Sequence, residues 1–531
     1  MLNLLLFSCA RVGAPNGGTR DSLAPKFLGS NIDTTRLNVS RTVKELRLDF
    51  DEYVMLKDFN KNFNVSPPIK KIKKVIPSNL ANKYVLIQWE DTLQANTTYN
   101  FNFGNAIVDN NESNPLPYFN FAFSTGDKID DLFVSGTVKD AMTLIKENQT
   151  AKDNKMVVGL YKAGENLDYK QKPDYITKVD EENYFELNFL PKGEFVIIAF
   201  DDENQNSVYD AGKEKVSFLK EKITLDSTSV RGLKLKLYPS KKMVKYKESK
   251  AINGGLLMTF EGNPETVEVK SLSEELKDFK VTHAKRSDSV NIWFDAEKSN
   301  LGGTVSKQVK LSYFTPTISD TISVSYKAVK DEFKLSNEAG NLIAPENNFV
   351  INTSLPIENL NTSSWKLESD SIAQDFTAKI SEKNPFKILV NSSFKPTKKY
   401  VLTIPKETVS SYYSSNDKSF QFQFEIDKPE NYGSFTAVIK NKPTAKFWVE
   451  LTNEKGEILY SQFTNASEVS FKNLKPATYI ARIRVDNNGN GFWDEADFAQ
   501  NIAAEDVYIF EKEINVRPLW EIKEDWELTN H

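Results

Sequence analysis

Alternation of apolar and polar residues with a period of two recurs along the whole chain. In each run, apolar side chains occupy every second position, and polar or small residues fill the positions between them. Such a run turns one face of a strand inward and the other toward water. The clearest runs lie at residues 46–50, 99–103, 119–123, 233–237 and 420–426. The pattern therefore predicts half-buried antiparallel strands.

Short clusters of Asn, Asp, Gly and Pro separate these runs, and helical periodicity longer than a turn or two is scarce. These features predict an all-β chain made of tandem β-sandwiches. Domains of roughly 100 to 150 residues divide a chain of this length into about five.

An internal repeat indicates that one kind of sandwich occurs twice. Residues 185–195 read FELNFLPKGEF, and after an apolar strand residues 202–206 read DENQN. Residues 469–479 read VSFKNLKPATY, and after another apolar strand residues 486–490 read DNNGN. Strands, turns and polar loops follow in the same order in both copies, which predicts a duplicated unit.

The charge and cysteine content exclude several classes of function. The chain has 68 basic and 73 acidic residues, for a net charge of -5, so no strong field favours nucleic acid as a partner. A single cysteine allows no disulfide within the chain. Past residue 9, no uncharged apolar stretch approaches the roughly 20 residues that a membrane-spanning helix needs.

The first residues carry the clearest chemical signal. An apolar run at residues 4–7 is followed by Ser8 and then by Cys9, which is the only cysteine in the chain. This arrangement is a lipobox, in which the apolar segment is removed and the cysteine becomes the lipid-bearing first residue. A triacylated cysteine anchors a protein firmly. No Lys or Arg precedes the run, which departs from ordinary export signals and suggests a truncated signal peptide.

Several motifs resemble known families. FDEYV at 50–54, VSPP at 65–68, TYNF at 98–101 and FSTG at 123–126 resemble the bacterial Ig-like domain at the N-terminus of a Bacteroidota lipoprotein family. The start CARVGAPNGG, from Cys9, is also similar to that family. The repeated unit, with its Leu-Pro-x-Gly-x-Phe turn, resembles the transthyretin-like or carboxypeptidase-regulatory-like sandwich. The resemblance implies an outer-membrane lipoprotein with a binding or scaffolding role and no established catalytic residue.

These observations predict a division of the chain into an N-terminal anchor and five domains. The anchor comprises a signal peptide (1–8) and a lipidated linker (9–26). The domains are a bacterial Ig-like domain (27–127), a transthyretin-like sandwich (130–240), a β-sandwich of uncertain type (241–345), an Ig-like β-sandwich (346–428) and a second transthyretin-like sandwich with an Asp/Asn loop (429–531).

The Asp/Asn loop of the last domain is a candidate calcium site. Oxygen-bearing side chains fall at the spacing of an EF-type loop, Gly491 supplies the sharp turn, and Phe492 would offer its carbonyl. The candidate ligands are Asp486, Asn488, Asn490, Phe492, Asp494 and Asp497. The same residues also suit an ordinary Asn- and Gly-rich turn. Both interpretations remain open.

The first copy of the repeat has a weaker version of this loop. Its candidate ligands are Asp202, Asn204, Asn206 and Asp210. Ser207 stands where the other loop has glycine, and Lys213 stands where the final carboxylate belongs, so the turn interpretation is favoured here.

Other chemistry has less support. Only His283 and His531 are present, which argues against a multi-histidine zinc site or a Ser-His-Asp triad. The basic run at 70–74 could contact lipid head groups, but a solvated loop or charged sheet edge is favoured. An Asp-Ser/Thr-apolar pattern matches the Bacteroidota O-glycosylation sequon. Its candidate acceptors are Ser22, Thr92, Ser289, Thr321 and Ser371.

The sequence thus predicts a non-catalytic, lipid-anchored outer-membrane protein that docks on other envelope proteins. The complex could serve outer-membrane assembly, secretion or transport. The alternative is a surface lipoprotein that binds glycans, since these sandwich types also serve as carbohydrate modules. The expected partners are the membrane, through the lipid on Cys9, and other outer-membrane proteins. No acidic residue follows Cys9 directly, which favours the periplasmic leaflet, although the leaflet stays open.

Overall fold

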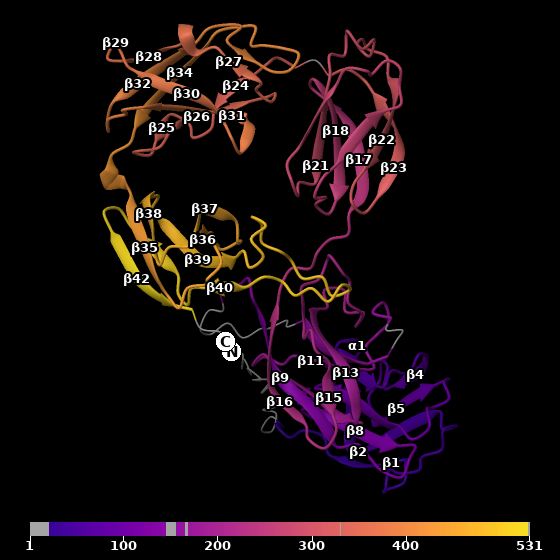
Figure 1. The fold of residues 1–531 in the computed structure, drawn as a ribbon. Coiled ribbons are helices and arrows are strands. Elements are labelled where there is room, and N and C mark those ends of the chain that lie inside the picture. Colours follow the sequence, from indigo (N-terminus) through magenta and orange to yellow (C-terminus); the bar gives the residue numbers. More distant parts are fainter. Residues whose placement is uncertain (1–20, 145–154, 165–167, 330, 529–531) are drawn as a thin grey trace, which may run out of the picture. The chain divides into compact units, whose positions relative to one another are not determined.

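The computed structural model describes residues 21–144, 155–164, 168–329 and 331–528. Nearly all regular structure in these residues is β-strand (Figure 1). The exceptions are one helical turn, α1 (Phe59–Asn62), and two short 3-10 turns, Thr362–Ser364 and Pro429–Asn431. The predicted all-β class and tandem sandwiches are therefore confirmed. The chain divides into two compact units. Unit 1 is the chain up to Leu237, except for two short segments that begin at Ala141 and Ala211. Unit 2 comprises these two segments and the chain from Tyr238.

The first sandwich of unit 1 has an aromatic core. Its strands are β1 (Phe27–Ser30), β2 (Glu45–Leu56), β3 (Asn64–Ser66), β4 (Ile72–Ile76), β5 (Asn82–Trp89), β6 (Thr98–Gly104), β7 (Ile107–Asp109) and β8 (Phe119–Ser124). One sheet has the order β1-β2-β5-β4, with β7 beside β2, and the other has the order β3-β6-β8. Alternate residues of β6 and β8, Phe101, Phe103, Phe121 and Phe123, are buried between the sheets.

The second sandwich of unit 1 contains the first copy of the repeat. Its strands are β9 (Leu132–Asp140), β10 (Met156–Lys162), β11 (Tyr175–Lys178), β12 (Tyr184–Leu190), β13 (Gly193–Asp201), β14 (Val216–Phe218), β15 (Ile223–Leu225) and β16 (Val230–Leu237). One sheet has the order β11-β10-β13-β14, with β15 beside β13, and the other has the order β12-β9-β16. β9 and β16 are parallel and approach closely, since a Cβ at Gly136 would lie 2.2 Å from the Leu233 carbonyl oxygen.

Unit 2 begins with a two-sheet sandwich in the segment whose type the sequence left uncertain. Its strands are β17 (Lys245–Ile252), β18 (Gly255–Glu261), β19 (Glu268–Ser271), β20 (Lys280–His283), β21 (Ser289–Trp293), β22 (Lys307–Phe314) and β23 (Ser319–Tyr326). The sheets have the orders β17-β18-β21-β20 and β19-β22-β23. Met258, Ile292, Leu311 and Tyr326 are buried in its core.

The next sandwich of unit 2 ends in the alternating phenylalanines of residues 420–426. Its strands are β24 (Leu335–Asn337), β25 (Leu342–Ile343), β26 (Phe349–Thr353), β27 (Asn359–Leu360), β28 (Lys366–Ser369), β29 (Ile372–Ala373), β30 (Phe376–Ser381), β31 (Asn384–Ser392), β32 (Lys399–Ile404), β33 (Val409–Ser410) and β34 (Phe420–Ile426). The sheet orders are β24-β26-β31-β30, β25-β34-β32-β28-β29 and β27-β33. Phe424 and Ile426 are buried, whereas Phe420 and Phe422 are half-buried at the margin of the core.

The last sandwich contains the second copy of the repeat. Its strands are β35 (Gly433–Lys440), β36 (Phe447–Thr452), β37 (Ile458–Thr464), β38 (Glu468–Leu474), β39 (Ala477–Val485), β40 (Val507–Ile509), β41 (Ile514–Val516) and β42 (Glu521–Glu527). The sheet orders are β37-β36-β39-β40, with β41 beside β39, and β38-β35-β42, with β35 and β42 parallel. Strand order and strand direction match those of the second sandwich, so β10, β11 and β13 correspond to β36, β37 and β39.

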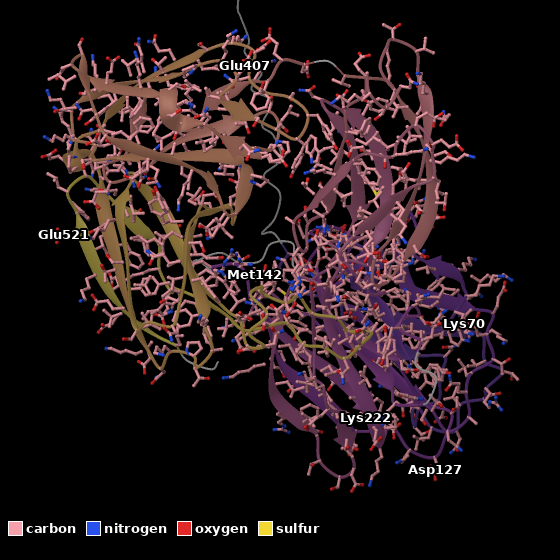
Figure 2. All side chains as sticks on the ribbon, turned by 45° about the horizontal axis from the view of Figure 1, so that its top comes forward. Lys70, Asp127, Met142, Lys222, Glu407 and Glu521 are labelled. Carbon is pink, nitrogen blue, oxygen red and sulfur yellow. The ribbon has the colours of Figure 1, made fainter. Side chains whose placement is uncertain are left out.

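Each of the five sandwiches has its own buried apolar cluster. Charged side chains such as Lys70, Lys222 and Glu407 project from the surface (Figure 2). This separation of apolar and charged positions is what the alternating pattern predicts for strands with one face buried.

Candidate functional site

The Asp/Asn loop of the last sandwich follows β39 and is wound around one carboxylate. Asp486 is buried, and its two oxygens accept hydrogen bonds from the backbone amides of Asn490 and Gly491, each at 3.0 Å. The Asn488 side-chain oxygen also accepts from the Asn490 amide, at 3.0 Å. Gly491 has a φ of +81°, in the left-handed region that favours glycine. Asp486, Asn488, Asn490 and Gly491, four of the residues that the sequence selected, therefore form one compact turn.

Asp494 and Glu505 close this loop. The side-chain amides of Asn488 and Asn490 donate to Asp494, the latter at 2.7 Å. Glu505 accepts from the backbone amides of Asn488 and Asp494 at 3.1 and 2.9 Å. Burial raises the pKa of Glu505. Burial also acts to raise the pKa of Asp494, but hydrogen bonds from Asn488, from Arg286 and from Asn490 outweigh it, and that pKa is lowered.

The first copy of the repeat forms the same network. Asp202 accepts from the amides of Asn206 and Ser207 at 3.0 Å, and the Asn204 side chain donates to Asp210 at 2.6 Å. Ser207 adopts a φ of +62°, so serine occupies the left-handed position that glycine fills in the other loop.

Glu214 closes the first loop as Glu505 closes the second. Its oxygens accept from the amides of Glu203 and Asp210 at 3.1 and 2.8 Å. Burial is the main cause that raises the Glu214 pKa to about 7, and the charges of Asp202 and Asp210 add to it.

The position-12 residues of the EF-type spacing lie elsewhere. Asp497 accepts from the Gln500 amide at 3.2 Å, and the closing carboxylate next to Asp494 is Glu505. In the first loop, Glu214 takes this role directly after Lys213. The two glutamates lie 12 and 19 residues past the first aspartate of their loops, so a fixed spacing finds neither. The sequence signal that could have found both glutamates is a Glu-x-Val tripeptide that the two copies share and whose valine begins the next short strand.

The donor set of both loops is rich in oxygen, as calcium prefers. Among the described residues, however, no group of three or more His, Cys, Asp or Glu side chains is arranged to hold a metal ion. The amide nitrogens of Asn488 and Asn490 point at Asp494, so a cation there requires both amides to turn.

A buried charge cluster on the last sandwich escaped sequence reasoning. Glu450 of β36 receives hydrogen bonds from Arg482 Nε at 2.8 Å and from Arg484 Nε at 3.1 Å, both on β39. The side chains of Glu450, Arg482 and Arg484 are 1%, 8% and 23% exposed. The Arg484 guanidinium lies 5.8 Å from the Trp448 ring centre and 5.9 Å from that of Trp493. One carboxylate thus faces two cations on the outer side of a sheet.

The other predicted residues are exposed or half-buried, or lie outside the described residues. Cys9 belongs to the latter group. Four of the candidate glycosylation hydroxyls are exposed, while half-buried Ser289 donates to Asp288 at 2.7 Å. The basic run at 70–74 extends into β4, an edge strand, where Lys73 and Lys74 are exposed. His283 contacts the Ser287 carbonyl oxygen at 3.1 Å.

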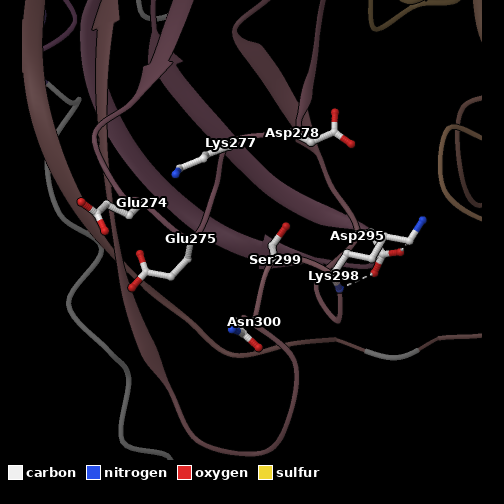
Figure 3. Close-up of a pocket in the computed structure, with 8 residues that line it drawn as sticks. All are labelled: Glu274, Glu275, Lys277, Asp278, Asp295, Lys298, Ser299 and Asn300. Carbon is white, nitrogen blue, oxygen red and sulfur yellow. Dashed lines mark hydrogen bonds and ion pairs between the residues drawn. The ribbon is translucent and has the colours of Figure 1, made fainter.

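The first sandwich of unit 2 has a pocket of about 320 Å³ (Figure 3). Charged and polar side chains line it, and Figure 3 shows Glu274 and Asp278 on opposite sides. Asp295 and Lys298 form an ion pair of 3.7 Å at one side. Ligand pockets are predominantly apolar with a few converging polar groups, and this pocket lacks that character.

Comparison with known proteins identifies the first domain. A family model described as bacterial Ig-like domain matches residues 21–125, which confirms the expected Ig-like domain. No curated protein matches the chain. In the part of the chain that the structure describes, no helix is long and apolar enough to cross a membrane.

Solved structures resemble the chain only distantly. The S-layer protein rSbsC is 12% identical over 93% of this chain and 67% of its own, with a TM-score of 0.15. SGBP-B of the Bacteroides ovatus mixed-linkage glucan utilization locus is 10% identical over 74% and 97%, with a TM-score of 0.21. The Bacillus cereus major pilin subunit BcpA is 11% identical over 75% and 99%, with a TM-score of 0.13. Likeness at this level assigns no function.

Proposed function

We propose that this protein is a non-catalytic interaction protein of the bacterial outer membrane, held there by lipid on Cys9 and docked on other envelope proteins. The observation that carries the proposal is the series of five separately cored sandwiches. A chain built in this way offers long sheet faces and edges as contact surfaces.

Crosslinking in intact cells followed by affinity purification tests the docking role. We expect one or a few outer-membrane proteins to be recovered in constant ratio to this chain, and to be lost when Cys9→Ser releases it from the membrane. Recovery of the chain without any protein partner, from cells in which it is anchored, would overturn the proposal.

Glycan binding is the second candidate, and one observation favours it. The rings of Trp448 and Phe463 stack at 4.4 Å on the outer face of the last sandwich, and Phe463 is 44% exposed. Exposed aromatic faces can stack on sugar rings, and Arg484 beside Trp448 could donate hydrogen bonds to hydroxyls. Retention on a polysaccharide column that Phe463→Ala abolishes would favour this function over docking.

Calcium is the cofactor that we propose for the Asp/Asn loop of the last sandwich, and the loop of the second sandwich is the weaker candidate. With calcium at about 100 times its Kd, binding should stabilise the last sandwich by about 2.7 kcal/mol. Asp486→Asn retains an acceptor for the loop amides but removes the charge, so it should abolish the heat of calcium binding at this loop in titration calorimetry. Asp202→Asn is the matched variant in the other loop. An absence of binding heat in the unsubstituted protein at millimolar calcium would leave both loops as ordinary turns.

A further inference from the structure

The edge strand β37 of the last sandwich has the composition of a strand that is normally paired. β37 lies at the end of the order β37-β36-β39-β40, so one side of its backbone has no partner strand in the part of the chain that the structure describes (Figure 1). Its sequence is ILYSQFT, and Ile458, Leu459 and Phe463 are 45%, 49% and 44% exposed. An exposed edge with apolar side chains is a template for pairing with another strand.

Other long edge strands of the described chain carry charges, which natural proteins use to block such pairing. Among described edge strands of seven or more residues, β37 is the one without Asp, Glu, Lys or Arg. The others, each with at least one charge, are β12, β16, β17, β23, β38 and β42. Even the short edge strand β4 carries Lys73 and Lys74. Among the long edge strands of the described chain, the lack of charge is therefore confined to β37, whereas the shorter edge strands β1 and β8 are uncharged as well.

The repeat provides an internal comparison. β11 occupies the position of β37 in the second sandwich, and three of its four residues are buried. The Ile176 amide of β11 donates to Ser66 Oγ of the first sandwich at 3.3 Å. In unit 1 this edge is thus an interface between sandwiches. In the last sandwich the corresponding edge is exposed.

The sequence of β37 is complementary to itself in the antiparallel direction. With Ser461 opposite Ser461, Leu459 lies opposite Phe463 on one face, and Tyr460 lies opposite Gln462 on the other. Leu459 and Phe463 then meet each other in both halves of the pair, Ile458 lies opposite Thr464, and a small residue lies at the centre. No charge opposes a like charge within the strand. A two-fold axis through Ser461 produces this arrangement.

We propose that two copies of this protein pair through β37 across a two-fold axis at Ser461, which joins their five-stranded sheets into one continuous sheet. The self-complementary pattern favours a second copy over an unrelated strand as the occupant. This inference goes beyond the proposed docking role, because a dimer can form whether or not an envelope partner exists.

Sedimentation equilibrium of the full chain tests the proposal. The Cys9→Ser background is used, so that neither lipid nor a disulfide through the natural thiol can join two copies. We expect twice the chain mass at high concentration and dissociation on dilution. A mass of one chain at every concentration would overturn the proposal, and a partner recovered in cells would still support the docking role.

Charge substitutions at the axis test the interface. Ser461→Lys and Ser461→Asp should each give monomers, because two like charges meet at the axis. An equal mixture of the two variants should restore dimers, which also shows that both variants are folded. Ser470→Lys, on the edge strand β38 of the other sheet, is the matched control and should remain dimeric. A dimer that persists in Ser461→Lys, or a mixture that stays monomeric, would rule out this pairing.

A cysteine at the axis tests the register. Directly opposed residues of an antiparallel pair have Cα atoms about 4.5 or 5.5 Å apart, which lies within the range for a disulfide. Ser461→Cys should therefore form a disulfide-linked dimer on mild oxidation. Gln462→Cys, which the register places opposite Tyr460, should crosslink far less. Equal crosslinking of the two variants would contradict the proposed register.

Discussion

Replacing Glu450 with alanine should lower the free energy of unfolding of the last sandwich by about 3–5 kcal/mol. The Glu450 side chain is 1% exposed and hydrogen-bonded to both Arg482 and Arg484. Alanine would leave two guanidinium groups facing each other without a counter-charge, in a site largely closed to water. Hydrogen exchange read by mass spectrometry is the measurement. Protection of the β36 and β39 amides should fall about 100-fold or more.

Two matched variants separate this effect from general damage. Asp525→Ala removes a carboxylate 2.7 Å from Lys440 in the same sandwich, but both side chains are more than half exposed, so the loss should stay below about 1 kcal/mol. Replacing all three charged residues by apolar ones should restore most of the stability. In the second sandwich the positions of Arg482 and Arg484 are occupied by Ile198 and Phe200, which supply suitable side chains. Equal protection in Glu450→Ala and Asp525→Ala would contradict this account.

Replacing Cys9 with serine should move nearly all of the protein from the membrane fraction to the soluble fraction. Cys9 is the only thiol of the chain and directly follows Ser8 and an apolar run, so serine removes the single atom that can carry the lipid. A triacylated cysteine is the anchor that holds the protein under this hypothesis. Fractionation of cells and immunoblotting of both fractions measure the change. The far-ultraviolet circular dichroism of the released protein should be unchanged.

Ser22→Ala is the control for the anchor. It removes a nearby hydroxyl that is a candidate for glycosylation but leaves the lipobox intact, so it should remain in the membrane fraction. Mass spectrometry of the N-terminal peptide should show the lipid mass in this control and not in Cys9→Ser. Membrane retention of Cys9→Ser at the level of the unsubstituted protein would refute the lipoprotein hypothesis.

The sequence by itself determined the fold class, because strand formation leaves a period of two in the order of apolar residues. Tyr99, Phe101 and Phe103 alternate with polar residues, and all three are buried. At 420–426 the alternation predicted a strand correctly, yet Phe420 and Phe422 are only half-buried. Alternation shows which face of a strand turns inward. How many residues of that face are buried depends on the sheet that packs against it.

The candidate loops could be found in part. Asp486, Asn488, Asn490 and Asp494 follow one another within a single turn, so local spacing was sufficient to group them. Glu505 contacts this turn although it lies 19 residues past Asp486, and Glu214 contacts the corresponding turn 12 residues past Asp202. Spacing in the sequence carries no information about such closures, because the distance along the chain differs between the two copies.

Only the tertiary structure decided which charged side chains on the outer face of the sheets are paired and buried. Alternation places Glu450, Arg482 and Arg484 on the face that normally meets water, and for isolated strands that reading is correct. In the folded sandwich these side chains pair across neighbouring strands and lie beside Trp448 and Trp493, which leaves the carboxylate almost without water contact. Burial of this kind depends on residues brought together across strands and from a distant loop, and such neighbours are set by packing rather than by order along the chain.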